Sequence, residues 1–266
     1  MLHFLQGAAT VAIAYPLVAH NRRLCLKQRW SHQLLAILGI ELDATLTGFE
    51  PGSLIVANHI SWLDIFAINA ARPAAFVSKA EVRGWPLIGW LSAKTDTVFL
   101  RRGSRGHAKI VNAEIDALLN AGKDVAIFPE GTTTDGTHLL GFHAALLQPA
   151  VETGRPVQPV ALSYETPDGQ RTLAAAYAGE TTLLECVGAI LATRCMVVRL
   201  QPTAALAPAL PSSGGRRELA QAARDAIALR LGLPRVNNQL GTPADPPVER
   251  PSDGAPTGNQ NPARVA

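Results

Sequence analysis

The feature that most constrains the fold is a regular alternation of short apolar runs with helical segments, which begins near Glu41. The runs are apolar or β-branched and are bounded by Gly, Pro or charged residues, as β-strands are. Seven stretches have this character: Leu42–Leu46, Leu54–Ala57, Ala75–Val77, Thr97–Leu100, Val125–Phe128, Val157–Ser163 and Cys195–Leu200. The alternation predicts a single α/β domain with a mixed central sheet flanked by helices.

Three of the intervening segments carry apolar residues every three or four positions, the spacing that places them on one face of a helix. These segments are Arg105–Asn120, Thr181–Thr193 and Arg216–Leu231. From Pro234 onward, Pro, Asn, Gly and Asp dominate and no apolar period remains, a composition typical of disordered chain. We therefore expect a domain over residues 41–233 and a disordered tail over residues 234–266.

The first 40 residues form a separate apolar segment. It is apolar from Leu2 to Ala19, then basic at Arg22 to Arg29, then apolar again from Leu34 to Ile40. A membrane-spanning helix needs about 20 consecutive apolar residues, and polar residues and Pro16 interrupt this run. We expect an apolar helical pair over residues 1–40 that associates with a membrane surface. The alternative is a helical hairpin packed on the protein's own core.

Composition narrows the possible partners. Charged residues make up 17% of the chain, below the ~25% usual for soluble proteins. The net charge of +3, from 24 Lys and Arg against 21 Asp and Glu, is too small for a typical nucleic-acid binder. Cys25, Cys186 and Cys195 have no CxxC spacing, which gives no zinc or redox motif and fits a reducing compartment.

A His and an Asp directly after the expected strand Leu54–Ala57 form the first candidate catalytic motif. His59 and Asp64 are five positions apart, where a loop turns into a helix. The Asp64 carboxylate can accept a hydrogen bond from one imidazole nitrogen, which fixes the tautomer and leaves the other nitrogen as a base. Alone, this spacing is weak evidence for a catalytic pair, because a solvated His beside a helix-capping Asp has the same pattern. No GxSxG, GxxxxGK or GxGxxG motif is present, which disfavours three common enzyme classes.

Two further motifs follow expected strands at their carboxyl ends, where α/β folds bind ligands. In Phe128–Thr133, the glycine Gly131 lets successive backbone N–H groups converge on an anion, with Thr hydroxyls beside them. An ordinary Pro-Glu-Gly turn is the alternative. Arg101 and Arg102 follow the strand Thr97–Leu100, and arginine suits bidentate phosphate binding.

Taken together, these motifs resemble those of the glycerophospholipid acyltransferase family, which acylates lysophosphatidic acid and related lysolipids. Four family motifs match in order: Asn-His-x4-Asp at Asn58–Asp64, apolar residues followed by Arg at Phe99–Arg101, Phe-Pro-Glu-Gly-Thr at Phe128–Thr132, and an apolar stretch around a Pro at Val157–Val160. The resemblance covers about residues 40–201. An N-terminal apolar helical pair often precedes the domain in this family, as Leu2–Ile40 does here.

The resemblance implies acyl transfer from acyl-CoA or an acyl carrier protein thioester to the free hydroxyl of a lysolipid. The leading acceptor is 1-acyl-sn-glycerol-3-phosphate, which gives phosphatidic acid. His59 is then the general base and Asp64 orients it. The expected head-group ligands are Arg101, Glu130, Gly131 and Thr132. No metal, cofactor or covalent acyl-enzyme is expected, and the enzyme belongs at the cytoplasmic face of the inner membrane.

Two departures from the family pattern affect the acceptor. Thr133 stands where the family commonly has Arg after Glu-Gly-Thr, and Phe142-His143 stands where it often has Phe-Lys. Both changes remove a permanent cation from the expected phosphate site. The run Glu130–Gly136 also resembles the subgroup that acylates lyso-ornithine lipid, which is the alternative acceptor.

Other interpretations of these residues remain open. Ser61 is a conceivable nucleophile, but its neighbours lack a nucleophile elbow. His138 and His143 are five apart in a Gly-rich loop, not at the helical spacing of zinc enzymes. Gly84–Leu91, with two Trp residues, suits either a membrane interface or a buried helix. The alternative from another class is a catalytically inactive, membrane-peripheral lipid-binding protein that keeps the fold and these motifs.

Overall fold

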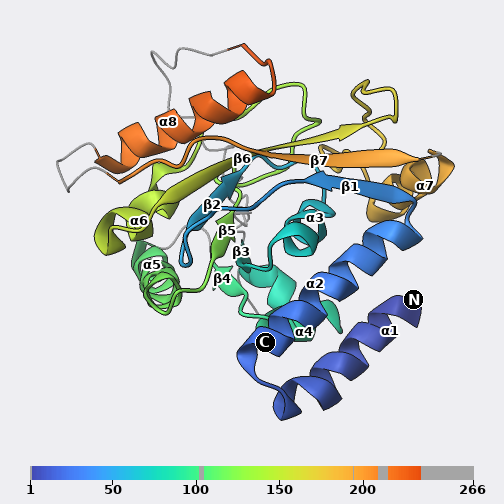
Figure 1. Ribbon diagram of the computed structural model, residues 1–266, viewed down its shortest axis with the longest axis horizontal. Helices are drawn as coiled ribbons and strands as arrows, with labels where there is room; N and C mark the ends of the chain where they lie inside the picture. Colours follow the sequence, from blue (N-terminus) through green and yellow to red (C-terminus); the bar gives the residue numbers. More distant parts are fainter. Residues whose placement is uncertain (1, 102–104, 194, 209–214, 235–266) are drawn as a thin grey trace, which may run out of the picture. The chain divides into compact units, whose positions relative to one another are not determined.

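A seven-stranded mixed sheet forms the centre of the domain, in the order β1-β7-β6-β2-β5-β3-β4 (Figure 1). This computed structural model describes residues 2–101, 105–193, 195–208 and 215–234. The strands are β1 (Ile40–Ala44), β2 (Leu54–Ala57), β3 (Ala75–Lys79), β4 (Val98–Leu100), β5 (Val125–Ile127), β6 (Val157–Glu165) and β7 (Met196–Pro202). Strands β2 to β6 run parallel, while β7 is antiparallel to β6 and carries β1 parallel to itself. The predicted α/β fold with a mixed sheet is confirmed.

All seven predicted strands are present, with small differences at their ends. Strand β1 begins at Ile40, two residues before the predicted start, because Ile40 is buried and lies in register with Met196 of β7. Strand β6 runs two residues past the prediction, to Glu165, where it still pairs with Val197 of the antiparallel strand β7. Strand ends are thus set by the neighbouring strand as much as by local sequence.

Eight α-helices surround the sheet within the described residues: α1 (Leu2–Ala9), α2 (His20–Ile37), α3 (Asp64–Ala71), α4 (Ile88–Lys94), α5 (Arg105–Asn120), α6 (Gln148–Thr153), α7 (Leu183–Ala192) and α8 (Gly215–Arg230). Shorter helical turns are η1 (Thr10–Ala14), η2 (Tyr15–Leu17), η3 (Ala80–Gly84) and η4 (Ala144–Leu147). The three helices predicted from apolar spacing correspond to α5, α7 and α8. Apart from residue 234, the predicted disordered tail over residues 234–266 lies outside the described residues.

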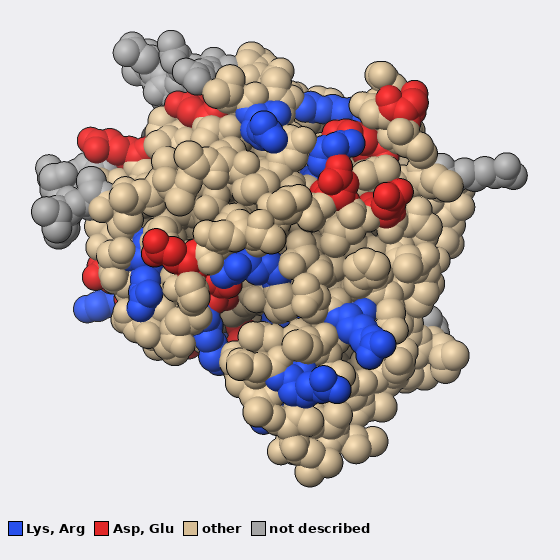
Figure 2. All heavy atoms as spheres, in the orientation of Figure 1, with Lys and Arg blue, Asp and Glu red and all other residues tan. Residues whose placement is uncertain are grey.

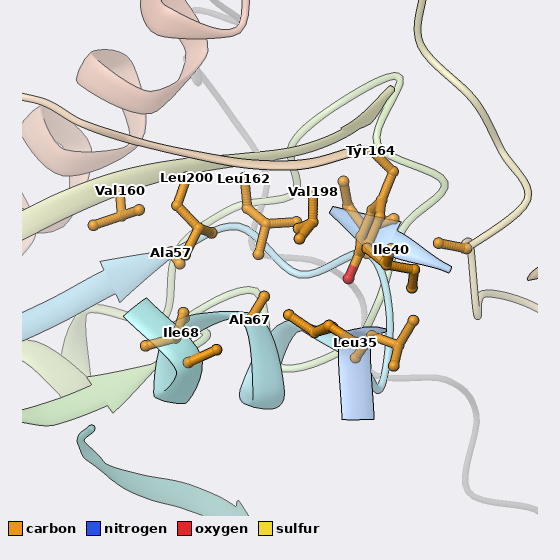
Figure 3. Close-up of a cluster of buried hydrophobic side chains, with 14 of the residues drawn as sticks. Leu35, Ile40, Ala57, Ala67, Ile68, Val160, Leu162, Tyr164, Val198 and Leu200 are labelled. Atoms are coloured by element: carbon orange, nitrogen blue, oxygen red, sulfur yellow. The ribbon is translucent and has the colours of Figure 1, made fainter. Parts of the chain in front are cut away.

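The helices bury two apolar cores, one on each face of the sheet. Helices α2, α3 and α7 contribute to the first core, which Figure 3 shows between β6, β7 and the helices below them. Helices α5, α6 and α8 contribute to the second. Strand β2 serves both, because Ile55 and Ala57 point to one core while Leu54 and Val56 point to the other. This two-residue alternation is the geometry of a strand buried on both faces.

The N-terminal helical pair lies against the domain. The Lys27 ammonium of α2 donates to the Ala74 carbonyl at 2.7 Å, and the Gln28 side-chain amide donates to the Ala70 carbonyl at 3.0 Å. Helix α1 is held to α2 through Trp30, whose ring stacks on His3 with centroids 4.7 Å apart. Within the described part of the chain, no helix has both the length and the apolar character needed to cross a membrane.

The contact of Lys27 in α2 with the domain makes the stability of the protein depend on pH. Burial lowers the pKa of Lys27 to about 8, with Asp96 opposing and Lys123 adding to the effect. Between this pKa and the ~10.4 of an unfolded lysine, the unfolded chain binds more protons, so stability rises with pH. We expect the free energy of unfolding of the wild type, relative to Lys27→Met, to rise by about 2 kcal/mol between pH 7.5 and 10.

Urea unfolding at the two pH values measures this difference. Lys109→Met, at an exposed position of α5, is the matched control and is expected to show a constant difference. A constant difference for Lys27→Met as well contradicts the prediction.

Candidate functional site

The carboxyl ends of β2 and β5 lie side by side, because the two strands pair in parallel from Leu54↔Val125 to Val56↔Ile127. His59 follows β2 by two residues, and Phe128–Thr132 follow β5 directly. Loops at the carboxyl ends of parallel strands are where open α/β sheets bind their ligands. Two of the sequence motifs therefore meet at this edge of the sheet.

His59 and Asp64 form a hydrogen-bonded pair. The imidazole Nδ1 lies 2.8 Å from Asp64 Oδ2, with the His59 side chain 19% exposed and that of Asp64 fully buried. The same carboxylate oxygen accepts the backbone N–H groups of Ile60 at 2.7 Å and Ser61 at 2.9 Å. Asp64 is the first residue of α3, where a negative charge also meets the positive end of the helix dipole. The bond at Nδ1 leaves Nε2 as the ring nitrogen available to a substrate.

Glu130 holds the backbone of His59 from the opposite side. Its Oε1 accepts the His59 N–H and its Oε2 accepts the Leu140 N–H, both at 2.9 Å. Burial raises the pKa of Glu130, and the backbone N–H groups of Leu140 and His59 oppose this rise. The Thr134 N–H donates to the His59 carbonyl at 2.8 Å. The loop after β5 thus binds both backbone groups of His59.

An aromatic ring fixes the plane of the imidazole. Phe128 stacks on His59 with ring centroids 4.0 Å apart and planes 8° from parallel. Phe76 of β3 lies behind it, with its centroid 6.1 Å from that of Phe128. Stacking of this kind restricts rotation of the His59 side chain.

The remaining predicted head-group residues lie along the same edge. Gly131 adopts φ +73°, a conformation that favours glycine, and Thr132 is exposed beside it. Arg101 is also exposed and follows β4, three strands away from β2 in the sheet. At ~4.8 Å per strand spacing, its backbone is about 14 Å from the end of β2. The structure brings His59, Asp64 and Glu130 into contact and leaves Arg101 apart from them.

Ser61 faces the interior. It is fully buried, and its Oγ accepts the Leu63 N–H at 3.3 Å. A substrate at the open side of His59 therefore does not meet this hydroxyl. Within the described ranges, no three His, Cys, Asp or Glu side chains are grouped to hold a metal ion.

Two buried residues contribute to the site without having been assigned a role from the sequence. The Asn58 side-chain amide donates to the Leu162 carbonyl at 2.9 Å and accepts the Leu162 N–H at 2.8 Å, which joins the end of β2 to β6. The Tyr164 hydroxyl donates to Asp64 Oδ1 at 2.7 Å. Sequence gives no distinct signal for Tyr164, because β6 also contains the polar residues Gln158, Ser163 and Glu165.

Comparison with known proteins matches the sequence of this chain to a family. The family described as Acyltransferase matches residues 41–163. The lyso-ornithine lipid O-acyltransferase of Pseudomonas aeruginosa is 42% identical over 211 residues, which cover 77% of this chain and 80% of the relative. The 1-acyl-sn-glycerol-3-phosphate acyltransferase of Neisseria meningitidis is 37% identical over 163 residues, 61% of this chain and 64% of that protein.

A solved structure shares the fold. The crystal structure of the 1-acyl-sn-glycerophosphate (LPA) acyltransferase from Thermotoga maritima superposes with a TM-score of 0.59 and 20% sequence identity, covering 88% of this chain and 95% of that one. The family match and the relatives identify an acyltransferase, and the solved structure shows the same fold. The chain belongs to the acyltransferase family, as its four motifs predicted.

Glu130→Gln tests whether Glu130 acts on the backbone or on the substrate. A Gln side chain has one oxygen and one NH2 group, so one of the two backbone N–H groups that Glu130 now binds is left facing a donor. An unsatisfied buried donor costs about 1–3 kcal/mol, and we expect the free energy of unfolding to fall by that amount together with kcat.

Urea unfolding and steady-state kinetics measure the two effects. The matched control is Glu50→Gln at an exposed position, which is expected to change neither. A Glu130→Gln variant of unchanged stability and raised KM for the acceptor contradicts the backbone role and favours direct contact with the head group.

Proposed function

We propose that this protein transfers an acyl group from a thioester of coenzyme A or acyl carrier protein to the free hydroxyl of a lysolipid, with His59 as the general base. The observation that carries the proposal is the 2.8 Å contact of His59 Nδ1 with the buried Asp64 carboxylate. With Nδ1 bonded to Asp64, Nε2 is the ring nitrogen left to accept a proton from the substrate. A positioned base of this kind is what a weak hydroxyl nucleophile needs at neutral pH.

The reaction proceeds in one displacement at the thioester carbonyl. As the hydroxyl oxygen bonds to the carbonyl carbon, its proton passes to His59 Nε2. The tetrahedral intermediate then expels the thiol sulfur, and the carbon–sulfur bond breaks while His59 returns the proton to the sulfur. Asp64 stays ionised and stabilises the imidazolium in between. An ester and a free thiol result, with no covalent enzyme intermediate.

For the acceptor, we propose lyso-ornithine lipid, which reverses the order expected from the sequence. Thr133 replaces the arginine common in the family, and its hydroxyl donates to the Tyr177 carbonyl, so this position supports the loop and supplies no cation. Lyso-ornithine lipid has no phosphate that needs one. The Pseudomonas aeruginosa relative named for that acceptor also aligns over 77% of this chain.

The second candidate acceptor is 1-acyl-sn-glycerol-3-phosphate. The Neisseria meningitidis relative carries that name, and the exposed Arg101 lies on the same edge as His59.

A single incubation series tests both the reaction and the acceptor. Purified protein in detergent receives labelled acyl thioester and either lyso-ornithine lipid or 1-acyl-sn-glycerol-3-phosphate. We expect thioester-dependent acylation of lyso-ornithine lipid, and a rate lower by about 10²–10⁴ for His59→Ala. The readouts are labelled diacyl product and released thiol.

Three results contradict parts of this proposal. Exclusive acylation of 1-acyl-sn-glycerol-3-phosphate overturns lyso-ornithine lipid as the proposed acceptor but leaves the proposed acyl transfer unchanged. A near-normal rate for His59→Ala overturns the assignment of His59 as the general base. Lysolipid binding by the wild type without any thiol release overturns the proposed acyltransferase activity and favours a lipid-binding protein.

We also propose that the N-terminal segment and α4 form one membrane-contacting surface at the cytoplasmic face of the inner membrane. Large apolar side chains are exposed in both segments: Leu2, Leu5, Ile13 and Leu17 in the first, and Trp85, Ile88 and Trp90 in or beside α4. The two segments are neighbours, because Val11, Pro16 and Trp90 line a common hollow of about 450 Å³. Apolar and Trp side chains of this kind insert at the lipid interface.

The charge of this region supports the same proposal. Residues 1–40 contain no Asp or Glu, whereas α2 carries Arg22, Arg23 and Arg29. Figure 2 shows Lys and Arg side chains over the region of α1 and α2. A basic surface beside exposed apolar side chains suits a membrane that contains anionic lipid.

A charge placed in this surface is expected to release the protein from membranes. Ile13 is 67% and Leu17 is 81% exposed, so the double variant Ile13→Asp/Leu17→Asp leaves the core intact. We expect it to lose flotation with phosphatidylethanolamine–phosphatidylglycerol vesicles and to keep its activity in detergent. Leu229→Asp, 66% exposed on α8 at the other face of the sheet, is the control that still floats. Unchanged flotation of the double variant contradicts the proposed surface.

A further inference from the structure

Tyr164 is a buried tyrosine whose hydroxyl reaches the site from the centre of the sheet. It lies in β6 and is only 2% exposed. Figure 3 shows its ring extending from the strand into the apolar core, with the hydroxyl oxygen at the tip. That hydroxyl donates to Asp64 Oδ1 at 2.7 Å, across 100 positions of sequence. A tyrosine hydroxyl buried among apolar side chains requires such a partner.

The two oxygens of Asp64 are held by different parts of the chain. Oδ2 accepts from His59 Nδ1 and from the backbone N–H groups of Ile60 and Ser61, which all belong to the loop after β2. Oδ1 accepts from Tyr164, which belongs to the sheet. The loop donors alone fix one oxygen and leave the carboxylate plane to rotate about it. The Tyr164 hydroxyl fixes the second oxygen and therefore the plane.

We propose that Tyr164 is a positioning residue for acyl transfer, which sets the orientation of Asp64 and, through it, the direction of His59 Nε2. This inference rests on the proposed function of His59 as the general base. Tyr164 itself touches neither the acceptor nor the thioester. Its role is to keep the carboxylate plane aligned with the imidazole while the proton is on His59.

The electrostatics of the buried pair support this role. Burial, with a further contribution from the Asp64 charge, raises the pKa of Tyr164 well above its usual range, so the hydroxyl stays a donor throughout the working pH range. Its O–H dipole offsets part of the Asp64 charge felt by His59. Removal of the hydroxyl therefore raises the affinity of His59 for its proton and moves the acidic limb of the rate profile to higher pH.

Other titratable groups face the pair and are the same in all variants. Glu130 faces His59 from the loop after β5, with its carboxylate on the His59 N–H. The Cys186 thiol of α7 faces Tyr164 and Asp64 from the helix layer, and burial raises its pKa. A shift of the acidic limb between the wild type and a Tyr164 variant therefore reports on the His59–Asp64 pair.

Tyr164→Phe removes the hydroxyl and keeps the ring in the core. In the lysolipid acylation assay we expect kcat to fall about tenfold, KM for both substrates to stay within about twofold, and the acidic limb of kcat to move up by about half a pH unit. Tyr15→Phe is the matched control. This change also removes a hydroxyl, which donates to the Arg23 carbonyl at 3.3 Å in the N-terminal segment. The Tyr15→Phe variant is expected to keep the wild-type kcat and the wild-type acidic limb of the pH profile of kcat.

A double-mutant cycle separates positioning from general loss of structure. In a His59→Ala background there is no base to orient, so Tyr164→Phe is expected to leave the residual rate unchanged. Near-ultraviolet circular dichroism of each variant reports core packing. An equal drop in rate in both backgrounds overturns the proposal, as does a Tyr164→Phe enzyme with wild-type kcat and an unshifted limb. Failure of the proposed function gives a different result, a His59→Ala enzyme as active as the wild type.

Discussion

A single buried carboxylate, Asp64, is the group on which the site depends. Its side chain is fully buried, and a buried charge is tolerated only when hydrogen-bonding partners replace the lost water. Those partners are the imidazole of His59, the N–H groups of Ile60 and Ser61, and the hydroxyl of Tyr164. The need to satisfy one charge therefore joins the loop after β2, the start of α3 and the carboxyl end of β6.

The second buried carboxylate, Glu130, completes the support of His59. Parallel pairing of β2 with β5 places the two loops side by side, and Glu130 accepts the His59 N–H from the neighbouring loop. Phe128 adds a stacked ring on the imidazole. The backbone, the plane and one ring nitrogen of His59 are thus each fixed by a different neighbour. In the proposed mechanism, His59 is therefore oriented before the substrate arrives, which is the arrangement that catalysis by positioning requires.

The strands and the pairing of His59 with Asp64 could be predicted from sequence, whereas the contacts that support this pair could not. Each strand is a short apolar run with a clear boundary, so all seven were predicted. Helix α3 buries most of its residues and so lacks an amphipathic period. His59 and Asp64 are near in sequence and were paired by spacing, but Tyr164 reaches Asp64 across 100 positions. Glu130, expected at the head group, has both oxygens on backbone N–H groups. Such contacts depend on strand register, which local sequence does not specify.

In the proposed mechanism, Asp64 fixes the tautomer of His59 so that Nε2 meets the substrate. Nitrogen-15 NMR of protein labelled at histidine, in detergent micelles and with His59→Gln used to assign the signal, measures this directly. We expect neutral His59 to carry its proton on Nδ1, in a strong hydrogen bond to Asp64, with Nε2 unprotonated. A neutral His59 protonated at Nε2, with a bare Nδ1, contradicts it.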